Sequence, residues 1–336
     1  MSSNSDNSVI SEKKITLIND TKDISDSISS NETHSTGLPY KLFTSRDTDV
    51  TYEFMEQHDS NTPIITPQQE QKLRRKTAFV IVTLTGTIDF LLYSDKATLS
   101  YASIFELWTD THLTQNRYNN ANTLFYVGYI IGLTNLIWVQ KFSIRRVMAV
   151  MCTSWTIIIF LHCTAYNYQG IYALRFFLGF VEAIAVPTLN ITMNQFLTPN
   201  EKNAYAPLFY SSCIGCGIFV SLIAYGILHA HSTVHTWKLF MIIIGGMTLI
   251  TTLIVYYIYP SNPTDAKFLS HNEKVWVIRR IQKESSSSIE QKRIKRHQII
   301  EAIRDPVSWL FCAFFLLQQL ANNLTYMQNI LFENIG

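Results

Sequence analysis

The chain has 336 residues, of which 47% are hydrophobic and 15% are charged. A typical soluble domain carries about 25% charged residues, so this composition argues against an ordinary soluble protein. The net charge of +2 gives no reason to expect a nucleic-acid partner.

The amino-terminal part of the chain is polar. Residues 1–76 are rich in Ser, Asn, Asp and Thr and contain few aromatic residues. A segment of this composition cannot bury enough apolar surface to offset the entropy lost on folding. Residues 1–76 are therefore predicted to be a disordered tail. No secretory signal peptide is expected, because the tail begins without an apolar run.

Long apolar segments follow the tail. A bilayer core is about 30 Å thick, so a helix that crosses it needs roughly 20 mainly apolar residues. Seven segments approach this length and are predicted to be transmembrane helices: residues 77–99, 120–139, 147–165, 171–193, 207–229, 238–259 and 308–330. Gly128 and Gly132 form a GxxxG pair in the second segment, which lets two helix backbones approach closely. Pro207 is expected in the first turn of the fifth helix, where proline is tolerated.

Lys and Arg residues are concentrated in alternate connections. They occur in residues 72–76, 141–146 and 260–306, whereas residues 166–170 and 230–237 contain none. Basic connections remain on the cytoplasmic side of a membrane, so the amino terminus is predicted to be cytoplasmic. An odd number of spans would then place the carboxyl terminus on the outer side.

The long basic connection, residues 260–306, has helix signals of its own. Ser270 and Glu273 have the spacing of a capping box, which predicts a helix that continues to about Glu284. A run of serines interrupts it, and a second basic helix is predicted to end near Arg304. We expect this connection to be a solvated cytoplasmic loop near the membrane surface.

Several segments resemble a known family of transporters. They are Asp95–Ser103 (DKATLSYAS), Leu113–Tyr129 (LTQNRYNNANTLFYVGY), Arg175–Ala183 (RFFLGFVEA) with Pro187, Tyr259–Lys274 (YPSNPTDAKFLSHNEK) and Ala302–Leu310 (AIRDPVSWL). In this order and spacing they resemble the major facilitator superfamily, and within it the fungal allantoate permease family of anion:cation symporters. The resemblance covers roughly residues 72–336.

The resemblance implies an all-α membrane protein of major facilitator type. It implies a six-helix amino-terminal bundle over residues 77–259, and a seventh helix in residues 307–336 that starts an incomplete second bundle. Because the family usually has twelve spans, the chain is expected to be truncated. Such transporters bind small organic anions or vitamins, often with a proton, between two bundles near the membrane midplane.

The sequence departs from the family pattern at two cytoplasmic positions. Gln140 and Lys141 stand where the family usually has Asp-Arg. The family's Glu-x-x-x-Arg-x-x-x-Trp pattern appears as Glu201, Tyr205 and Phe209. These departures favour an alternative in which the chain no longer transports.

Two carboxyl groups lie deep within predicted spans. A helix rises 1.5 Å per residue, which places Asp89 about 18 Å from the inner end of its span and Glu182 about 16 Å from the outer end of its span. Both depths are close to the midplane of the bilayer core. Buried carboxyls favour the protonated form, so the pair can share or relay a proton. The alternative is that each carboxyl only hydrogen-bonds to a neighbouring helix.

Further polar residues are candidates for a substrate site. Arg175 lies nearer the outer side and can attract a carboxylate, or it can pair with an acid on another helix. By resemblance, Asp95 and Lys96 belong to the family's first-span motif; they either line the cavity or mark the outer end of the helix. The remaining candidates, for which packing is the alternative role, are Tyr126, Tyr129, Asn190 and Asn194.

Other residue clusters give weaker signals. Cys213 and Cys216 have a CxxC spacing, but they lie in a run of small residues typical of helix packing. His229, His231 and His235 are close in sequence, yet the sequence supplies no acid nearby, so a solvated loop is expected rather than a metal site. No phosphate-binding loop or nucleophile motif indicates an enzyme, and no cofactor is expected.

The sequence therefore predicts a proton-coupled secondary active transporter of a small organic anion or vitamin in the plasma membrane. Its expected partners are the lipid bilayer, the anionic solute and the proton. The alternative is a membrane protein that does not transport: a degenerate product, a sensor, or a half-transporter that pairs with a second chain. A seven-helix receptor would need an external amino terminus, which the distribution of basic residues opposes.

Overall fold

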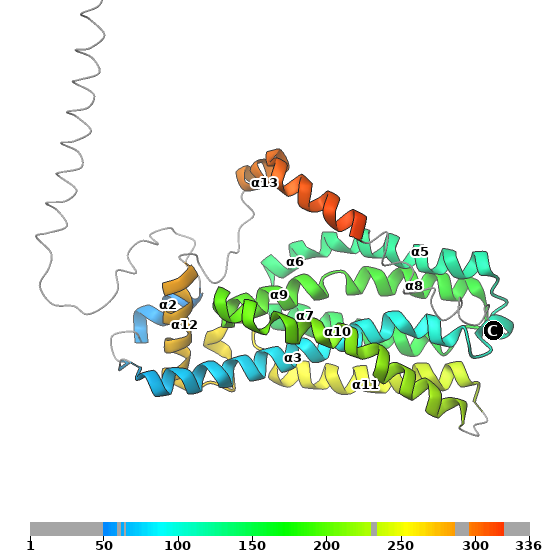
Figure 1. The fold of residues 1–336 in the computed structure, drawn as a ribbon, viewed down its shortest axis with the longest axis horizontal. Helices are drawn as coiled ribbons and strands as arrows, with labels where there is room; N and C mark the ends of the chain where they lie inside the picture. The colour runs from blue at the N-terminus through cyan, green and yellow to red at the C-terminus, as the bar shows by residue number, and fades with distance from the viewer. Residues whose placement is uncertain (1–49, 59–61, 64, 230–233, 286–295, 319–336) are drawn as a thin grey trace, which may run out of the picture. The chain divides into compact units, whose positions relative to one another are not determined.

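The computed structural model describes residues 50–58, 62–63, 65–229, 234–285 and 296–318 (Figure 1). Every regular element within these ranges is a helix. Residues 1–49 of the predicted tail and residues 319–336 of the predicted seventh span lie outside the described residues.

Six helical segments are long and apolar enough to cross a membrane. They are α3 (Pro67–Ala102), α5 and α6 (Gln115–Gly132 and Leu136–Lys141, joined by the 3-10 turn η2, Leu133–Asn135), α7 (Ile144–His162), α8 and α9 (Tyr168–Glu182 and Ala185–Phe196), α10 (Pro199–Leu228) and α11 (Thr236–Ile258). A shorter apolar helix, Pro306–Gln318, lies in the predicted seventh span. The structure thus confirms an all-α membrane protein with the six predicted amino-terminal spans. The remaining elements are α2 (Val50–His58), α4 (Leu107–Asp110), η3 (Pro263–Asp265), α12 (His271–Ser285) and α13 (Arg296–Arg304).

Two spans begin earlier than hydropathy indicates. α3 begins at Pro67, inside the segment predicted as a tail, where Thr66 donates its backbone N–H to the side chain of Gln69. α10 begins at Pro199, and Thr198 and Glu201 form a capping box there. Pro207 is therefore inside α10, and the prediction that it lies in the first turn is wrong. The polar cap, rather than the apolar run, sets the start of each helix.

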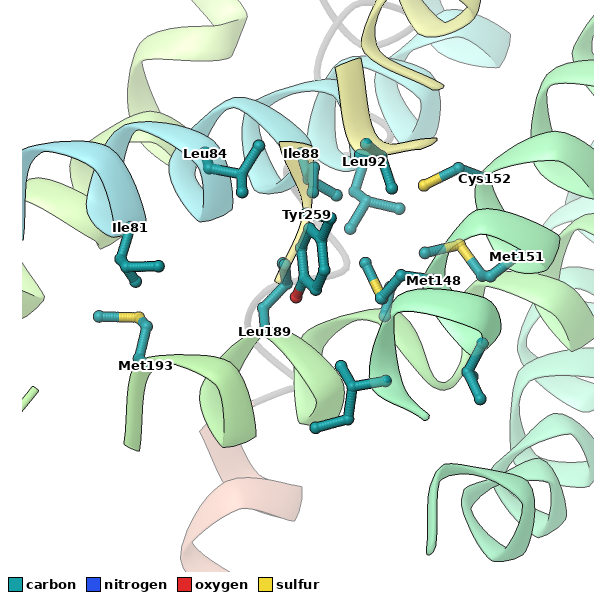
Figure 2. Close-up of a cluster of buried hydrophobic side chains, with 14 of the residues drawn as sticks. Ile81, Leu84, Ile88, Leu92, Met148, Met151, Cys152, Leu189, Met193 and Tyr259 are labelled. Atoms are coloured by element: carbon teal, nitrogen blue, oxygen red, sulfur yellow. The ribbon is translucent and has the colours of Figure 1, made fainter. Parts of the chain in front are cut away.

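The centre of the bundle is filled by side chains from several spans. Figure 2 shows Tyr259 among side chains of α3, α7 and α9, including Ile88, Met148 and Leu189. The Tyr259 hydroxyl lies 2.6 Å from the Thr192 hydroxyl, so its polar end is also satisfied. In a membrane such packing stabilises by dispersion and hydrogen bonding, since lipid is as apolar as the core.

α5 and α8 run side by side with their backbones in direct contact (Figure 1). A methyl group added to Gly128 would collide with the Phe176 carbonyl, and one added to Gly179 would collide with the Phe125 carbonyl. A methyl group added to Gly132 would likewise collide with the Phe180 carbonyl. The prediction that the GxxxG pair permits a close helix approach is confirmed.

The connection after α11 is packed against the protein, which differs from the expected solvated loop. Val275 and Ile278 of α12 are fully buried and contact Met55 of α2. The Trp276 indole donates a hydrogen bond to the Pro63 carbonyl at 2.9 Å. The basic residues of α12 suggest exposure, but its Val and Ile residues recur at helical spacing and form a buried face.

The predicted helix start in this connection is confirmed. The Ser270 backbone N–H donates to Glu273 at 2.8 Å, and Glu273 also forms an ion pair with Lys76 of α3 at 2.7 Å. Partial burial opposes ionisation of Glu273, but the hydrogen bonds from Lys76 and Ser270 outweigh it and hold the pKa of this carboxyl below its usual range. α12 is thereby tied to the start of the first span.

Substituting Gly128 tests the tight contact between α5 and α8. Gly128→Ala should lower the free energy of unfolding by about 1–3 kcal/mol, because the added methyl group overpacks the interface. Gly246→Ala on α11 is the matched control, since a methyl group there meets no atom within 4 Å. It should leave the free energy unchanged or raise it by up to about 1 kcal/mol, as helix propensity favours Ala. Thermal unfolding in detergent measures both; equal midpoints would contradict the close approach.

Candidate functional site

The polar residues of α3 are buried inside the bundle. Asp89 and Asp95 are each 2% exposed, and the Lys96 side chain is 14% exposed. α3 remains helical past all three, so successive side chains point about 100° apart around its axis. Asp95 and Lys96, although adjacent in sequence, therefore reach different neighbours.

Lys96 meets Glu182 of α8. Its ammonium nitrogen lies 3.6 Å from Glu182 Oε1, and Glu182 is only 1% exposed. The ammonium also lies over the rings of Tyr93 and Tyr129, at 4.9 and 5.9 Å from their centroids. Neither Glu182 oxygen has a hydrogen-bond partner within the described part of the chain. Lys96 and Glu182 thus form an ion pair beside two aromatic rings, and both Glu182 oxygens can still accept hydrogen bonds.

Asp95 belongs to a second buried cluster. The Trp155 indole of α7 donates a hydrogen bond to Asp95 Oδ2 at 3.1 Å. Thr98 lies 3.5 Å from Asp95 Oδ1 and accepts a hydrogen bond from Arg175 of α8 at 3.3 Å. The buried His162 also interacts electrostatically with Arg175. Thr98 therefore bridges an acid and a base that belong to different spans.

The two clusters form crossed pairs between α3 and α8. α3 supplies Asp95 and Lys96, and α8 supplies Arg175 and Glu182, so each helix contributes one acid and one base. The four formal charges sum to zero. An unpaired charge inside a membrane costs about 3 kcal/mol or more, so mutual compensation is what makes this arrangement tolerable.

Asp89 has a hydrogen-bond partner on a neighbouring helix, as the alternative to a shared proton expects. The Ser212 hydroxyl of α10 donates a hydrogen bond to Asp89 Oδ2 at 3.1 Å. Glu182 instead meets Lys96. The structure therefore gives each carboxyl of the expected proton relay its own neighbour on a separate helix.

The other predicted site residues lie at varying distances from these clusters. Tyr129 is beside Lys96, and Tyr126, although 43% exposed on α5, also interacts electrostatically with Lys96. Asn190 donates to the Val186 carbonyl of its own helix, and Asn194 accepts from Lys202 at 2.8 Å. α8 ends at Glu182 and α9 begins at Ala185, so Glu182 and Asn190 belong to separate helices.

Several residues in and beside these clusters, His162 among them, were not anticipated from the sequence. Tyr93 precedes Lys96 by one helical turn and Thr98 follows Asp95 by one turn, so spacing alone could have identified both. Trp155 and Ser212 come from other helices, and no signal in the sequence links them to α3.

Glu201 is the centre of a further network that was not anticipated. It forms an ion pair with Arg74 of α3, at 2.9 Å, and a second with Arg280 of α12, at 3.2 Å. Arg280 also donates to the Phe196 carbonyl at 3.2 Å. Burial lowers the pKa of Arg280, and the Glu201 carboxylate partly offsets this. This network joins α3, α9, α10 and α12 at one end of the bundle.

One histidine from the predicted solvated loop has an acidic neighbour. His235 Nδ1 lies 3.1 Å from Asp110 Oδ2, and Asp110 also accepts a hydrogen bond from the Trp237 indole at 2.8 Å. The expectation that no acid lies nearby was wrong, because α4 is remote in sequence. His231 lies outside the described residues.

Comparison with known proteins decides the family. The model of the Major Facilitator Superfamily matches residues 85–332. The chain belongs to the Major Facilitator Superfamily. It is therefore an integral, multi-pass membrane protein of a transporter family and not an enzyme.

Curated relatives from Saccharomyces cerevisiae are transporters. A high affinity cysteine transporter is 50% identical over 88% of this chain and 56% of its own length. An allantoate permease is 26% identical over 81% of this chain and 51% of its own length. A thiamine pathway transporter is 29% identical over 70% of this chain and 45% of its own length. The chain spans about half the length of these relatives.

Arg280→Gln tests the network around Glu201. Removing one partner of a buried ion pair leaves the other uncompensated, so we expect a loss of about 3 kcal/mol in the free energy of unfolding. Lys283→Gln is the control, since Lys283 is exposed on the same helix. Chemical unfolding of both variants measures the difference. If the two variants were equally stable, Arg280 would not anchor α12 to the spans.

Proposed function

We propose that the protein is a proton-coupled secondary active transporter of a small carboxylate solute, working by alternating access. The observation that supports this most directly is the buried contact between Lys96 and Glu182. A buried ammonium binds a carboxylate strongly, and a buried carboxyl can carry a proton. Both functions that such a symporter needs therefore meet in one pair.

Proton and solute movement are coupled because Glu182 and the carboxylate of the solute compete for Lys96. When a proton binds a Glu182 oxygen, the ammonium loses its counter-charge and becomes available to the carboxylate of the solute. When the solute leaves on the other side, Lys96 recovers Glu182 and the proton is released there. One proton and one carboxylate cross together, so the membrane interior does not hold an uncompensated charge.

The relatives support a carboxylate solute. Cysteine and allantoate, which two of their names give as solutes, both carry a carboxylate. Cysteine is the first solute to test, because the cysteine transporter is 50% identical to this chain. A cytoplasmic amino terminus and a plasma-membrane location remain part of the proposal, and the basic connections support this orientation.

Uptake of labelled cysteine tests the proposal. The chain of residues 1–336 is expressed in cells without their own cysteine permeases, and surface delivery is measured separately. We expect uptake that exceeds that of vector-only cells and that increases with an inward proton gradient. Normal delivery without uptake would refute transport by this chain and favour the alternative of a membrane protein that does not transport.

Glu182→Gln tests the coupling. The amide mimics a carboxyl that is always protonated, so cysteine binding should persist but should no longer change between acidic and neutral pH. Gradient-driven uptake should be lost. Glu106→Gln is the control, because the Glu106 side chain is 65% exposed beside His235. Calorimetric titration of purified protein measures binding, and an unchanged pH dependence in Glu182→Gln would exclude Glu182 as the proton carrier.

A further inference from the structure

Three polar residues follow one face of α3. Asp89, Tyr93 and Lys96 are spaced four and three residues apart, which places them in one stripe along the helix. The stripe starts with an acid and ends with a base. Lys96 has a role in the proposed coupling, whereas Asp89 has none there.

The Lys96 side chain leans toward Asp89. Long side chains on a helix point toward its amino-terminal end, which for Lys96 is the direction of Tyr93 and Asp89. The position of the ammonium over the Tyr93 ring, 4.9 Å from its centroid, agrees with this direction. Asp89 and Lys96 also interact electrostatically. The acid and the base thus flank Tyr93 from its two sides.

α10 forms the wall opposite this stripe. Its Ser212 hydroxyl donates to Asp89, and Cys213 interacts with the Tyr93 hydroxyl. Space remains next to Asp89: a methyl group added to Gly86, one turn before it, meets no atom within 4 Å. A hydroxyl, a thiol and a phenol therefore surround the two charges, and the helix leaves room at the acidic end.

We infer that Asp89, Tyr93 and Lys96 recognise the zwitterionic head of an α-amino acid, with the ammonium at Asp89 and the carboxylate at Lys96. This inference rests on the proposed function, which supplies the carboxylate at Lys96. It narrows the solute from a small organic anion to a molecule that carries both charges.

The separation of the two charges suits such a solute. Seven residues of helix span about 10 Å, and the inclined Lys96 side chain shortens the gap to Asp89. Two charge-assisted hydrogen bonds of about 2.8 Å, joined by the short amino acid head, can fill this gap. A solute with a carboxylate alone would leave the buried Asp89 without a cation and would be repelled by it.

Asp89→Asn tests this assignment with two ligands. Cysteine carries the ammonium, and 3-mercaptopropionate is cysteine without its amino group. In the unchanged protein, cysteine should bind more tightly than 3-mercaptopropionate. In Asp89→Asn, cysteine binding should weaken about tenfold or more, as expected for loss of one charge-assisted hydrogen bond. Binding of 3-mercaptopropionate should be unchanged or tighter, because a repulsive charge is removed.

Two controls separate recognition from folding. Asp89→Glu keeps the charge and should retain the preference for cysteine. Asp110→Asn makes the same chemical change in a carboxyl that pairs with Trp237 and His235, and it should affect neither ligand. Binding is measured by calorimetric titration of the purified full chain under a thiol reductant, and thermal unfolding midpoints confirm that each variant is folded.

The outcomes distinguish this inference from the proposed function. If Asp89→Asn weakened both ligands equally, Asp89 would serve the proton or the structure and the inference would be wrong, while carboxylate binding would stand. Equal binding of the two ligands to the unchanged protein would overturn the inference alone. If the unchanged protein bound neither ligand, the proposed function would fail as well.

Discussion

The compensation of four buried charges between α3 and α8 is the constraint on which the interior depends. Asp95 and Lys96 leave α3 in different directions. α8 compensates them at two places about two turns apart, where Arg175 reaches Thr98 beside Asp95 and Glu182 meets Lys96. A shift of either helix by one turn, about 5.4 Å, would separate both pairs at once. The cost of an unpaired charge in the membrane therefore holds the register of the two helices.

Close packing of α5 brings the aromatic part of the site into place. Gly128 and Gly179 let the two backbones touch, and Tyr129, the residue after Gly128, then lies within range of Lys96. A larger residue at either glycine would move α5 outward and withdraw this ring. The GxxxG pattern is therefore part of the site, because it sets the distance between an aromatic side chain and a buried ammonium.

Hydropathy and charge located the spans and most of the buried ionisable residues, because both follow from the cost of placing a group in lipid. The hydrogen-bond partners of these buried residues were harder to predict. Ser212 and Trp155 reach α3 through helix rotation and packing, which single-helix spacing does not encode. Pro207 was misplaced because the cap at Thr198 lies outside the apolar run.

The network at Glu201 restricts how the bundle can move. Glu201 of α10 holds cations from α3 and α12, so a motion that parts α10 from either helix at this end would break an ion pair to this buried carboxylate. A motion that carries the six spans together leaves these contacts intact. Rotation of the bundle as a rigid body therefore costs less than rearrangement within it, and this is the kind of motion that alternating access between two halves requires.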